Sequence, residues 1–370
     1  MTSWRADSPF NDLPPLPPRR EVETRPVLKL AIEARSSLAA LNQAVSTMAN
    51  PSVLINAIPL LEAQASSEVE NIVTTSDDLF RHAQDASSTD PATREALRYR
   101  TALMEGFALV SQRGIVTTNT AREVCSIIKG RRMDLRTGLG TFIDDPVTRR
   151  AAYTPPEGRA VIDEKLGSWE KFVNADHELD PLTAMALAHY QFEAIHPFDD
   201  GNGRTGRILN VLMLVAAGLL SRPVLYLSRY IIGHKDEYYA SLRAVTSDEA
   251  WTDWVEYVLE GVRQTSSSTL QKAARTHVLQ STVKQQIGRT IPNANIRLLD
   301  VLFEQPYCRI ANVMDACAVS RPTATKWLKS LVQHGVLEEV HAGRELLFIN
   351  TRFLELLTRD AEDGPATPPR

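Results

Sequence analysis

One short run near the middle of the chain combines the side chains that chemistry on a phosphate needs. It holds a histidine, an acidic pair, a glycine-rich turn and two arginines. The run is His196-Pro197-Phe198-Asp199-Asp200-Gly201-Asn202-Gly203-Arg204-Thr205-Gly206-Arg207. Histidine titrates near neutral pH and can take a proton from a hydroxyl, while a carboxylate beside phosphates commonly holds Mg²⁺. The run therefore predicts a phosphate site with a base beside it.

The glycines and arginines of this run favour an oligophosphate ligand. Gly201 and Gly203 permit positive φ angles, so that consecutive backbone N–H groups could converge on an anion at a helix N-terminus. Arg204 and Arg207 are three residues apart, which places both guanidinium groups on one side of a helix, within reach of successive phosphates. Phe198 is better explained as a core residue that fixes the loop.

Two helices must position this run. Residues 182–195 have helical character, and Pro197 disfavours helical geometry for His196, which is therefore predicted at a helix end, facing a cleft. Residues 204–220 resume as a mostly apolar helix whose basic end is its N-terminus. The predicted chemistry thus lies at the turn between the two helices.

The run also matches the motif of the Fic family, His-x-Phe-x-(Asp/Glu)-Gly-Asn-Gly-Arg-x-x-Arg, at every specified position. The resemblance implies a mainly α-helical fold: a Fic core with a small β-hairpin flap, which transfers AMP from ATP to a protein hydroxyl and releases pyrophosphate. By position, it implies His196 as the base and Asp200 as the Mg²⁺ ligand. The implied ATP-binding stretch is Asp200, Gly201, Asn202, Gly203, Arg204, Thr205, Gly206 and Arg207, with Asn202 and the loop amides around the α-phosphate and both arginines on the outer phosphates.

Two further segments resemble parts of Fic proteins. Leu135 to Ile143, followed by Tyr153-Thr154-Pro155-Pro156, is similar to the flap that aligns a target segment by strand pairing. The expected target-binding residues are Gly140, Thr141, Phe142 and Ile143; alternatively the segment is a surface hairpin. Tyr238 and Tyr239 resemble a segment near the nucleotide base, or they are two tyrosines of an amphipathic helix with one ring buried.

A third segment bears on regulation. Ser66, Glu70 and Asn71 fit the inhibitory motif of Fic proteins whose brake precedes the core, Ser/Thr-x-x-x-Glu-(Gly/Asn). On a helix Ser66 and Glu70 lie one turn apart, and the Glu70 carboxylate could pair with Arg207 in place of the γ-phosphate, which also brings Glu70 into the ATP site. The alternative is that Glu70 is an exposed helix acid.

The whole chain divides into several expected domains. Residues 1–110 should form an N-terminal arm and helices with the inhibitory motif, 111–265 the catalytic core, 266–290 a linker helix, 291–356 a winged helix-turn-helix and 357–370 a disordered tail. Proline and charge dominate residues 8–26, which predicts an extended packing arm, or alternatively a PxxP-type ligand. Helices are expected near 28–48, 53–71, 91–112, 117–129, 158–174, 181–195, 204–219, 236–246 and 248–263.

The expected winged helix has helices at 295–304, 309–317 and 320–334, and strands at 336–340 and 345–349 around a wing turn at residues 341–344. Its seven basic and seven acidic residues between 291 and 356 balance, which weakens the case for DNA, because phosphate neutralisation supplies much of DNA affinity. Basic residues on the third helix keep DNA binding open. Protein contact or homodimerisation is the favoured interpretation.

Composition adds few constraints. The chain has 370 residues, a net charge of −4 and an isoelectric point near 6.1, which predicts no general attraction to nucleic acid or membrane. Three cysteines form neither a disulfide framework nor a zinc pattern, and no secretory signal is apparent, so a cytoplasmic location is the simplest expectation.

These features favour one function and leave two alternatives. The favoured function is a protein adenylyltransferase with ATP as substrate and Mg²⁺ as cofactor, which modifies Ser, Thr or Tyr hydroxyls of itself and other proteins and is inhibited by Glu70. One alternative is a DNA-binding regulator with a nucleotide-sensing Fic core. The other is an enzyme that removes AMP from modified proteins, with Glu70 positioning or activating water.

Overall fold

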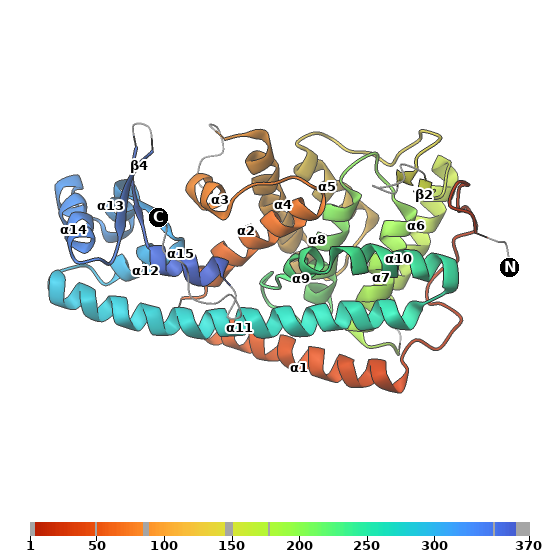
Figure 1. Cartoon of the computed structure of the whole chain (residues 1–370), viewed down its shortest axis with the longest axis horizontal. Coiled ribbons are helices and arrows are strands. Elements are labelled where there is room, and N and C mark those ends of the chain that lie inside the picture. The colour runs from red at the N-terminus through yellow and green to blue at the C-terminus, as the bar shows by residue number, and fades with distance from the viewer. Residues whose placement is uncertain are drawn as a thin grey trace.

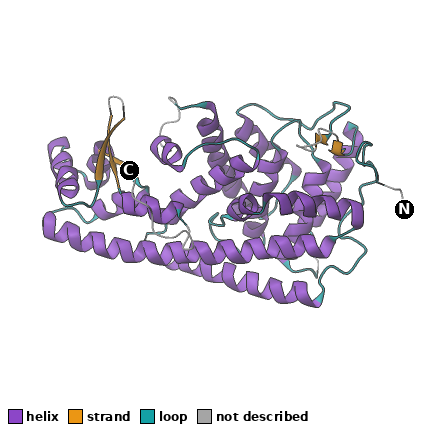
Figure 2. Cartoon of the chain, in the orientation of Figure 1, coloured by secondary structure: helices purple, strands orange, loops and turns teal. Residues whose placement is uncertain are grey.

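The computed structural model describes residues 4–48, 50–83, 89–144, 151–176, 178–342 and 345–359, and shows a mainly helical protein with two small antiparallel sheets (Figures 1 and 2). Of the predicted disordered tail, residues 357–370, the part from 360 onward lies outside the described residues, as does the wing tip at residues 343–344. Leu357 and Thr358 are instead the last residues of a helix, with Leu357 buried, because its side chain packs into the core. The helices are α1 (Arg25–Thr47), α2 (Ser52–Val69), α3 (Ser76–His82), α4 (Pro91–Arg113), α5 (Thr118–Lys129), α6 (Arg159–Val173), α7 (Pro181–Ile195), α8 (Asn202–Ala216), α9 (Leu227–Gly233), α10 (Lys235–Asp248), α11 (Trp251–Thr290), α12 (Arg297–Glu304), α13 (Ile310–Cys317), α14 (Arg321–Gln333) and α15 (Thr351–Thr358).

Helix α8 is packed among other helices. It contacts α2, α4, α5 and α7, and the residues between Ile208 and Leu214 are all buried. Helix α7, which precedes it, is buried along nearly its whole length. The helix that follows the turn is therefore fixed by α2, α4 and α5 as well as by α7, as a site that must keep a fixed geometry requires.

Helix α7 shows how local sequence sets the limits of these elements. The Asp180 side chain accepts the N–H of Leu182, and Pro181 occupies the first helical position. At the other end Pro197 prevents His196 from continuing the helix. The observed span, Pro181–Ile195, confirms the predicted one.

Two long helices run side by side along one edge of the molecule, α1 and α11 (Figure 1). The sequence predicted a core helix at 248–263 and a separate linker helix from 266, but the structure has one continuous helix of 40 residues. Thr265, Ser266 and Thr269 in its middle are buried. Packing of small polar side chains thus overrides their weak helix propensity.

The N-terminal arm is packed against the helical part of the structure. Leu13 and Val22 are buried, the Phe10 N–H donates to the Thr154 carbonyl (3.0 Å), and the Gln191 side chain donates to the Pro14 carbonyl (2.9 Å). The arm therefore packs on α7 and on the segment after the flap, as the packing-arm interpretation predicted.

The flap segment contains strands β1 (Ile143–Asp144) and β2 (Ala151–Tyr153), which pair in antiparallel fashion with Ile143 opposite Tyr153. The residues that connect the two strands lie outside the described ranges. The predicted β-hairpin pairing is present at its base.

The C-terminal region holds α12 to α15 and a three-stranded sheet of order β3-β5-β4, formed by β3 (Tyr307–Arg309), β4 (Glu338–Ala342) and β5 (Glu345–Ile349). Three helices followed by a hairpin is the order that the winged-helix hypothesis expects, and that hypothesis stays a prediction. Strand β3 and the short helices α3, α9 and α15 were not predicted, because segments of three to eight residues carry little periodicity. Among the described residues, no helix is long and apolar enough to cross a membrane.

Candidate active site

His196 ends α7 in the left-handed conformation, with φ of 50° and ψ of 60°. Few residues other than glycine adopt this conformation, because it costs free energy that surrounding contacts must offset. The His196 N–H donates to the Phe192 carbonyl (3.0 Å), and the His196 carbonyl accepts the Arg136 Nε–H (2.7 Å). These bonds fix the backbone from which the imidazole projects.

Arg136 is a residue whose role the sequence analysis missed. Its side chain is buried and donates to the carbonyls of Ile195 and Pro156 as well as that of His196, while its own N–H donates to the Pro197 carbonyl (2.9 Å). It thereby joins the flap segment to the end of α7. Its place in the segment Leu135 to Ile143 was noted, but no local pattern indicates these distant partners.

His196 has the electrostatics of a base rather than a cation. Burial, with a further contribution from the charge of Arg136, lowers the pKa of His196 to about 4. The imidazole is therefore neutral at physiological pH and can accept a proton.

The loop after His196 is held by its own side chains. Asn202 accepts the Phe198 N–H (2.8 Å) and donates to the Phe198 carbonyl (2.8 Å), and Phe198 is fully buried, as predicted. Gly201 precedes α8 with φ of 87°. The Asn202 side chain is thus occupied in closing the loop, so any α-phosphate cradle there consists of backbone N–H groups, not of that amide side chain.

Gly203 differs from its predicted conformation. Positive φ was expected, but Gly203 lies in the first turn of α8, which begins at Asn202 rather than at Arg204. The reason for glycine is space: a Cβ at Gly203 would lie 2.2 Å from Oε1 of Glu70. The Glu70 carboxylate therefore rests directly against the N-terminal turn of α8, where the helix dipole favours an anion.

Arg207 is held by α2 through three hydrogen bonds. Its Nε donates to the Ser66 hydroxyl (2.8 Å), and one terminal nitrogen donates to the Ser66 carbonyl (2.9 Å) and to Oε1 of Glu70 (2.8 Å). Burial works to raise the pKa of Glu70, but the charge and hydrogen bond of Arg207 outweigh it, and the pKa lies below its usual value. The pairing of Glu70 with Arg207 that the motif suggested is present, so Glu70 is no isolated surface acid.

The end of α2 sets the position of Glu70. The Asn71 backbone is left-handed, with φ of 60°, and the Ile72 N–H donates to the Ser67 carbonyl (3.0 Å), which ends the helix. The Asn71 side chain accepts the Lys235 ammonium (3.1 Å). Ser66 and Glu70 of the predicted inhibitory motif thus contact Arg207, whereas the Asn71 side chain contacts Lys235 of α10.

Arg204 and Asp200 belong to a cluster of four charges with Glu95 of α4 and Lys129 of α5. Arg204 is 2% exposed and lies 2.5 Å from Glu95 and 3.7 Å from Asp200; Lys129 lies 2.6 Å from Asp200 and 3.0 Å from Glu95. The expected contact of Arg204 with outer phosphates is therefore not open in this arrangement, because its guanidinium faces Glu95. Glu95 and Lys129 were missed because nothing near them in sequence marks them.

Asp200 has surroundings that suit a shared metal ion. Its side chain, in the loop just before α8, is 54% exposed, and within the described ranges no three His, Cys, Asp or Glu side chains converge as a protein-only metal site. A single accessible carboxylate fits Mg²⁺ that takes its other ligands from phosphate and water. Asp200 could bind such an ion once its ion pair with Lys129 is broken.

Glu193 is a second acid near Arg207 that the sequence analysis did not single out. Its Oε1 is buried and has no hydrogen-bond partner among the residues that the structure describes, and a Cβ at Gly206 would lie 2.4 Å from it. Burial raises the pKa of Glu193 to about 7. Gly206 is thus glycine because this carboxyl occupies the space, and Thr205 beside it is fully buried.

The two tyrosines have different environments. Tyr238 is buried among Trp254 and Tyr257, and its hydroxyl bonds to Nε2 of His189 (2.9 Å). This is the core position that the sequence left open, and a contact of its ring with adenine is not available here. Tyr239 is 39% exposed, packs edge-on against Tyr238, and stays a candidate for nucleotide contact.

The expected target-binding residues lie on an accessible edge. Phe142 is 56% exposed, Thr141 and Ile143 are half-buried, and the Gly140 N–H donates to the Glu157 carboxylate (2.5 Å). Gly140 has φ of 80°, which a side chain would strain. The strand-pairing role of this segment remains a prediction.

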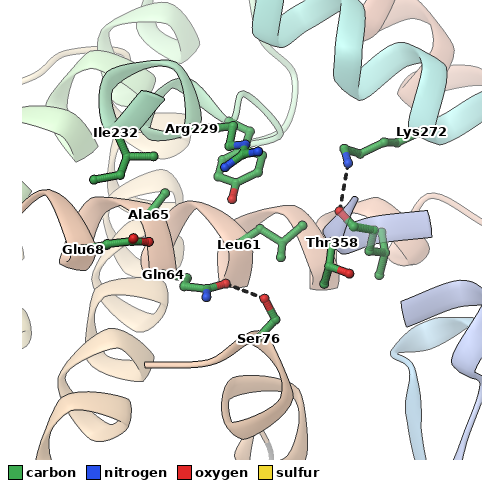
Figure 3. A pocket seen from close by; sticks show the side chains of 11 residues that line it. Leu61, Gln64, Ala65, Glu68, Ser76, Arg229, Ile232, Lys272 and Thr358 are labelled. Atoms are coloured by element: carbon green, nitrogen blue, oxygen red, sulfur yellow. Dashed lines mark hydrogen bonds between the residues drawn. The ribbon is translucent and has the colours of Figure 1, made fainter. Parts of the chain in front are cut away.

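A separate cavity of about 120 Å³ lies beside α2, between α9, α11 and α15 (Figure 3). It is lined by Leu61, Ala65 and Glu68, whereas Ser66 and Glu70 point to Arg207. At 100° per residue the two sets occupy nearly opposite faces of α2. Helix α2 is therefore enclosed between the candidate active site and the C-terminal region.

Three family models match the chain. The Fic/DOC family N-terminal model matches residues 28–108, the Fic/DOC family model matches 117–214, and the model of the protein adenylyltransferase SoFic-like C-terminal domain matches 282–353. The second range contains His196 to Arg207, and the first contains Ser66 to Asn71.

Curated relatives share short stretches with this chain. "Protein adenylyltransferase Fic" of Drosophila melanogaster is 42% identical over 65 residues, 17% of this chain and 13% of that protein. "Protein adenylyltransferase fic-1" of Caenorhabditis briggsae is 36% identical over 92 residues, 24% of this chain and 17% of that protein. The matches thus span less than a fifth of these relatives.

Solved structures share the fold. A Fic family protein from Desulfovibrio desulfuricans G20 superimposes with a TM-score of 0.51 and 19% identity, over 90% of this chain and 98% of that chain. Fic-1 from C. elegans gives a TM-score of 0.51 and 20% identity, over 68% of this chain and 74% of that chain.

Proposed function

Because the chain belongs to the Fic/DOC family, we propose that it is a Mg²⁺-dependent protein adenylyltransferase that transfers AMP from ATP to a protein hydroxyl. One observation carries the proposal. A neutral imidazole, His196, precedes a helix N-terminus at which a carboxylate, Glu70, already occupies an anion position against Gly203 and Arg207. An anion position next to a base is what transfer of a phosphate-bound group needs.

The reaction follows from these residues. His196 takes the proton of the target hydroxyl, whose oxygen bonds to the α-phosphorus of ATP as the bond from that phosphorus to the bridging oxygen breaks. Pyrophosphate leaves with the bond's electron pair. The backbone N–H groups at Gly201 to Gly203 and the guanidinium of Arg207 stabilise charge on the phosphates. Mg²⁺ held by Asp200 would neutralise phosphate charge.

The flap would present the target. Strand β1 and the segment before it expose Phe142, and Arg136 ties this segment to the backbone of His196. A target strand that pairs with the flap would place a Ser, Thr or Tyr hydroxyl near the base, including a hydroxyl of this chain itself.

We also propose that Glu70 keeps the resting protein inactive. Its carboxylate accepts a hydrogen bond from the Arg207 guanidinium, which the outer phosphates of ATP would need. The same guanidinium donates two further bonds to Ser66 of α2. ATP would then bind with its α-phosphate out of line with the hydroxyl. Removing the carboxylate frees Arg207 for the γ-phosphate.

The C-terminal region is proposed as a protein-contact or dimerisation module of winged-helix type. On α14, Lys329 is already paired with Glu339 (2.6 Å), which reduces the positive charge available to DNA phosphates. The proposed division remains 1–110, 111–265, 266–290 and 291–356, although α11 joins the second and third parts in one helix. A cytoplasmic location is the corresponding expectation.

The position of the label in ATP tests the proposed reaction. The purified Glu70→Gly protein is incubated without other proteins with ATP labelled on either the α- or the γ-phosphate, and its own labelling is followed. Transfer of AMP predicts that protein bands carry the α-label and no γ-label. Equal incorporation of both labels, or of neither, would contradict the proposal, and retention of defined DNA without labelling would favour the regulator.

A further inference from the structure

The four-charge cluster beside the α7–α8 turn consists of Glu95, Lys129, Asp200 and Arg204. In it, the Lys129 ammonium is bound to Asp200, the carboxylate that a metal ion would need. Lys129 Nζ lies 2.6 Å from Oδ2 of Asp200 and 3.0 Å from Oε1 of Glu95. Lys129 is only 16% exposed, so its ammonium is held between the two carboxylates rather than moving in solvent. The Lys129 ammonium thus forms ion pairs with two carboxylates.

The Lys129 stem is fixed as well. Lys129 is the last residue of α5, where the helix dipole favours a cation. A Cβ at Gly201 would meet the Lys129 Cδ at 3.4 Å and the Cys125 Sγ at 3.3 Å, so the end of α5 packs directly under the loop that carries Asp200. Backbone packing therefore aims this side chain at Asp200.

Glu95 gives the ammonium a second partner. It lies 2.5 Å from Arg204 and is 23% exposed, so it can hold Lys129 and Arg204 together when Asp200 is engaged elsewhere. The cluster carries two positive and two negative charges. A divalent cation that binds Asp200 must compete with Lys129 for the same carboxylate, because like charges repel at this separation.

We propose that Lys129 competes with the metal ion for Asp200 and sets the Mg²⁺ concentration at which the nucleotide site loads, with Glu95 as the acid that retains Lys129 once Asp200 binds metal. This inference rests on the proposed function, in which Asp200 is the metal ligand. Lys129 is then a positioning residue, since it acts through Asp200 and touches no reacting atom.

The test measures metal affinity without turnover. Mn²⁺ is titrated into the full-length protein with α,β-methylene-ATP, whose α-phosphate cannot be transferred, and free Mn²⁺ is followed by electron paramagnetic resonance. Lys129→Met should bind Mn²⁺ about three- to tenfold more tightly, which corresponds to about 0.7 to 1.4 kcal/mol, because a partly exposed ion pair that competes for Asp200 is lost. Glu95→Gln should weaken Mn²⁺ binding by a similar factor, because Lys129 and Arg204 then have only Asp200.

Three controls make the outcome decisive. Lys171→Met, which removes an exposed lysine of α6, should leave the Mn²⁺ affinity within twofold. If Lys129→Met has a lower thermal midpoint than the wild type, Lys129→Gln repeats the test. Lys129→Met combined with Asp200→Asn should lose the gain.

The possible failures are distinguishable. Unchanged or weaker Mn²⁺ binding by both Lys129 variants overturns this inference, and weaker nucleotide binding without metal would identify Lys129 as a phosphate ligand instead. If Asp200→Asn alone binds Mn²⁺ as tightly as the wild type, the metal site of the proposed function fails.

Discussion

At the scale of single residues, His196 combines a strained backbone with a lowered pKa. Its left-handed conformation is held by Phe192 and Arg136, and burial keeps the ring neutral. Strain of this kind persists where surrounding contacts fix it, and it is common at active sites. The imidazole is thus placed before any substrate binds.

Replacing His196 by Ala should abolish AMP transfer while ATP binding persists, since the phosphate contacts lie in the loop and at Arg207. Loss of a general base typically costs about 10² to 10⁴ in rate. Self-labelling in the Glu70→Gly background gives the rate, and calorimetry gives the ATP affinity. Turnover within threefold of the parent would exclude His196 as the base.

The ionisation of His196 is a second prediction at this scale. A histidine whose pKa is lowered to about 4 stays neutral as the pH falls through 6.5, where an unperturbed histidine would gain its proton. NMR titration of the imidazole carbons, assigned with His196→Ala, should show a midpoint near 4. A midpoint near 6.5 would show that the ring is solvated and not aligned as described.

The role of a residue could be predicted only where the residues next to it in sequence form a recognisable motif with it. The run from His196 to Arg207 indicates base, loop and arginines together because these residues are consecutive. Glu95 and Arg136 contact the same site from 109 and 60 positions away, and nothing local distinguishes them from surface charges. The glycine at position 203 was explained by the backbone freedom of glycine. The structure shows that it leaves space for the Glu70 side chain at the end of α2, more than 130 residues earlier.

At the scale of elements, α2 and α8 meet where the Glu70 carboxylate lies against Gly203. The contact has no room for a methyl group. Helix limits followed from caps and prolines, as in α7, while the continuity of α11 could not be predicted because its middle is stabilised by tertiary packing. Local sequence signals determine where a helix ends. Tertiary packing determines whether a stretch of low helix propensity in its middle stays helical.

Gly203→Ala tests the contact between these helices. The new Cβ would lie 2.2 Å from Glu70 Oε1, so the change should lower the thermal midpoint, even though Ala favours helices over Gly by about 1 kcal/mol. In the Glu70→Gly background the same change should cost much less, because the clashing carboxylate is gone. Gly167→Ala, at an open position of α6, is the control and should not destabilise. Equal losses in both backgrounds would refute the contact.

At the scale of the whole molecule, α2 connects the site to the C-terminal region. One face of α2 holds Arg207, and the other lines the cavity near α15. The Asn50 side chain, just before α2, donates to Asp300 of α12 (3.1 Å), and the Tyr307 hydroxyl donates to Asp77 of α3. The C-terminal region thus supports the helix that carries the proposed brake.

A chain that ends after Thr290 in the Glu70→Gly background should keep self-labelling within about threefold, since every proposed catalytic residue precedes this point. Its thermal midpoint should fall, because α2 and α11 lose their contacts with the C-terminal helices and apolar surface becomes exposed to water. Differential scanning calorimetry and labelling of the same samples measure both. A folded truncated protein without labelling would show that the C-terminal region helps to form the site.

The most direct test of the central claim is incorporation of labelled AMP by the wild type and by Glu70→Gly at equal ATP and Mg²⁺. Arg207→Ala and Glu70→Gly combined with His196→Ala complete the set, with folding checked by thermal melts. Glu70→Gly should label itself at least tenfold more than the wild type, since each 1.4 kcal/mol that favours the competent pose is a tenfold shift. Arg207→Ala should not be activated, and the double variant should be silent. Equal incorporation by the wild type and Glu70→Gly would contradict the account of Glu70 as the brake on this site.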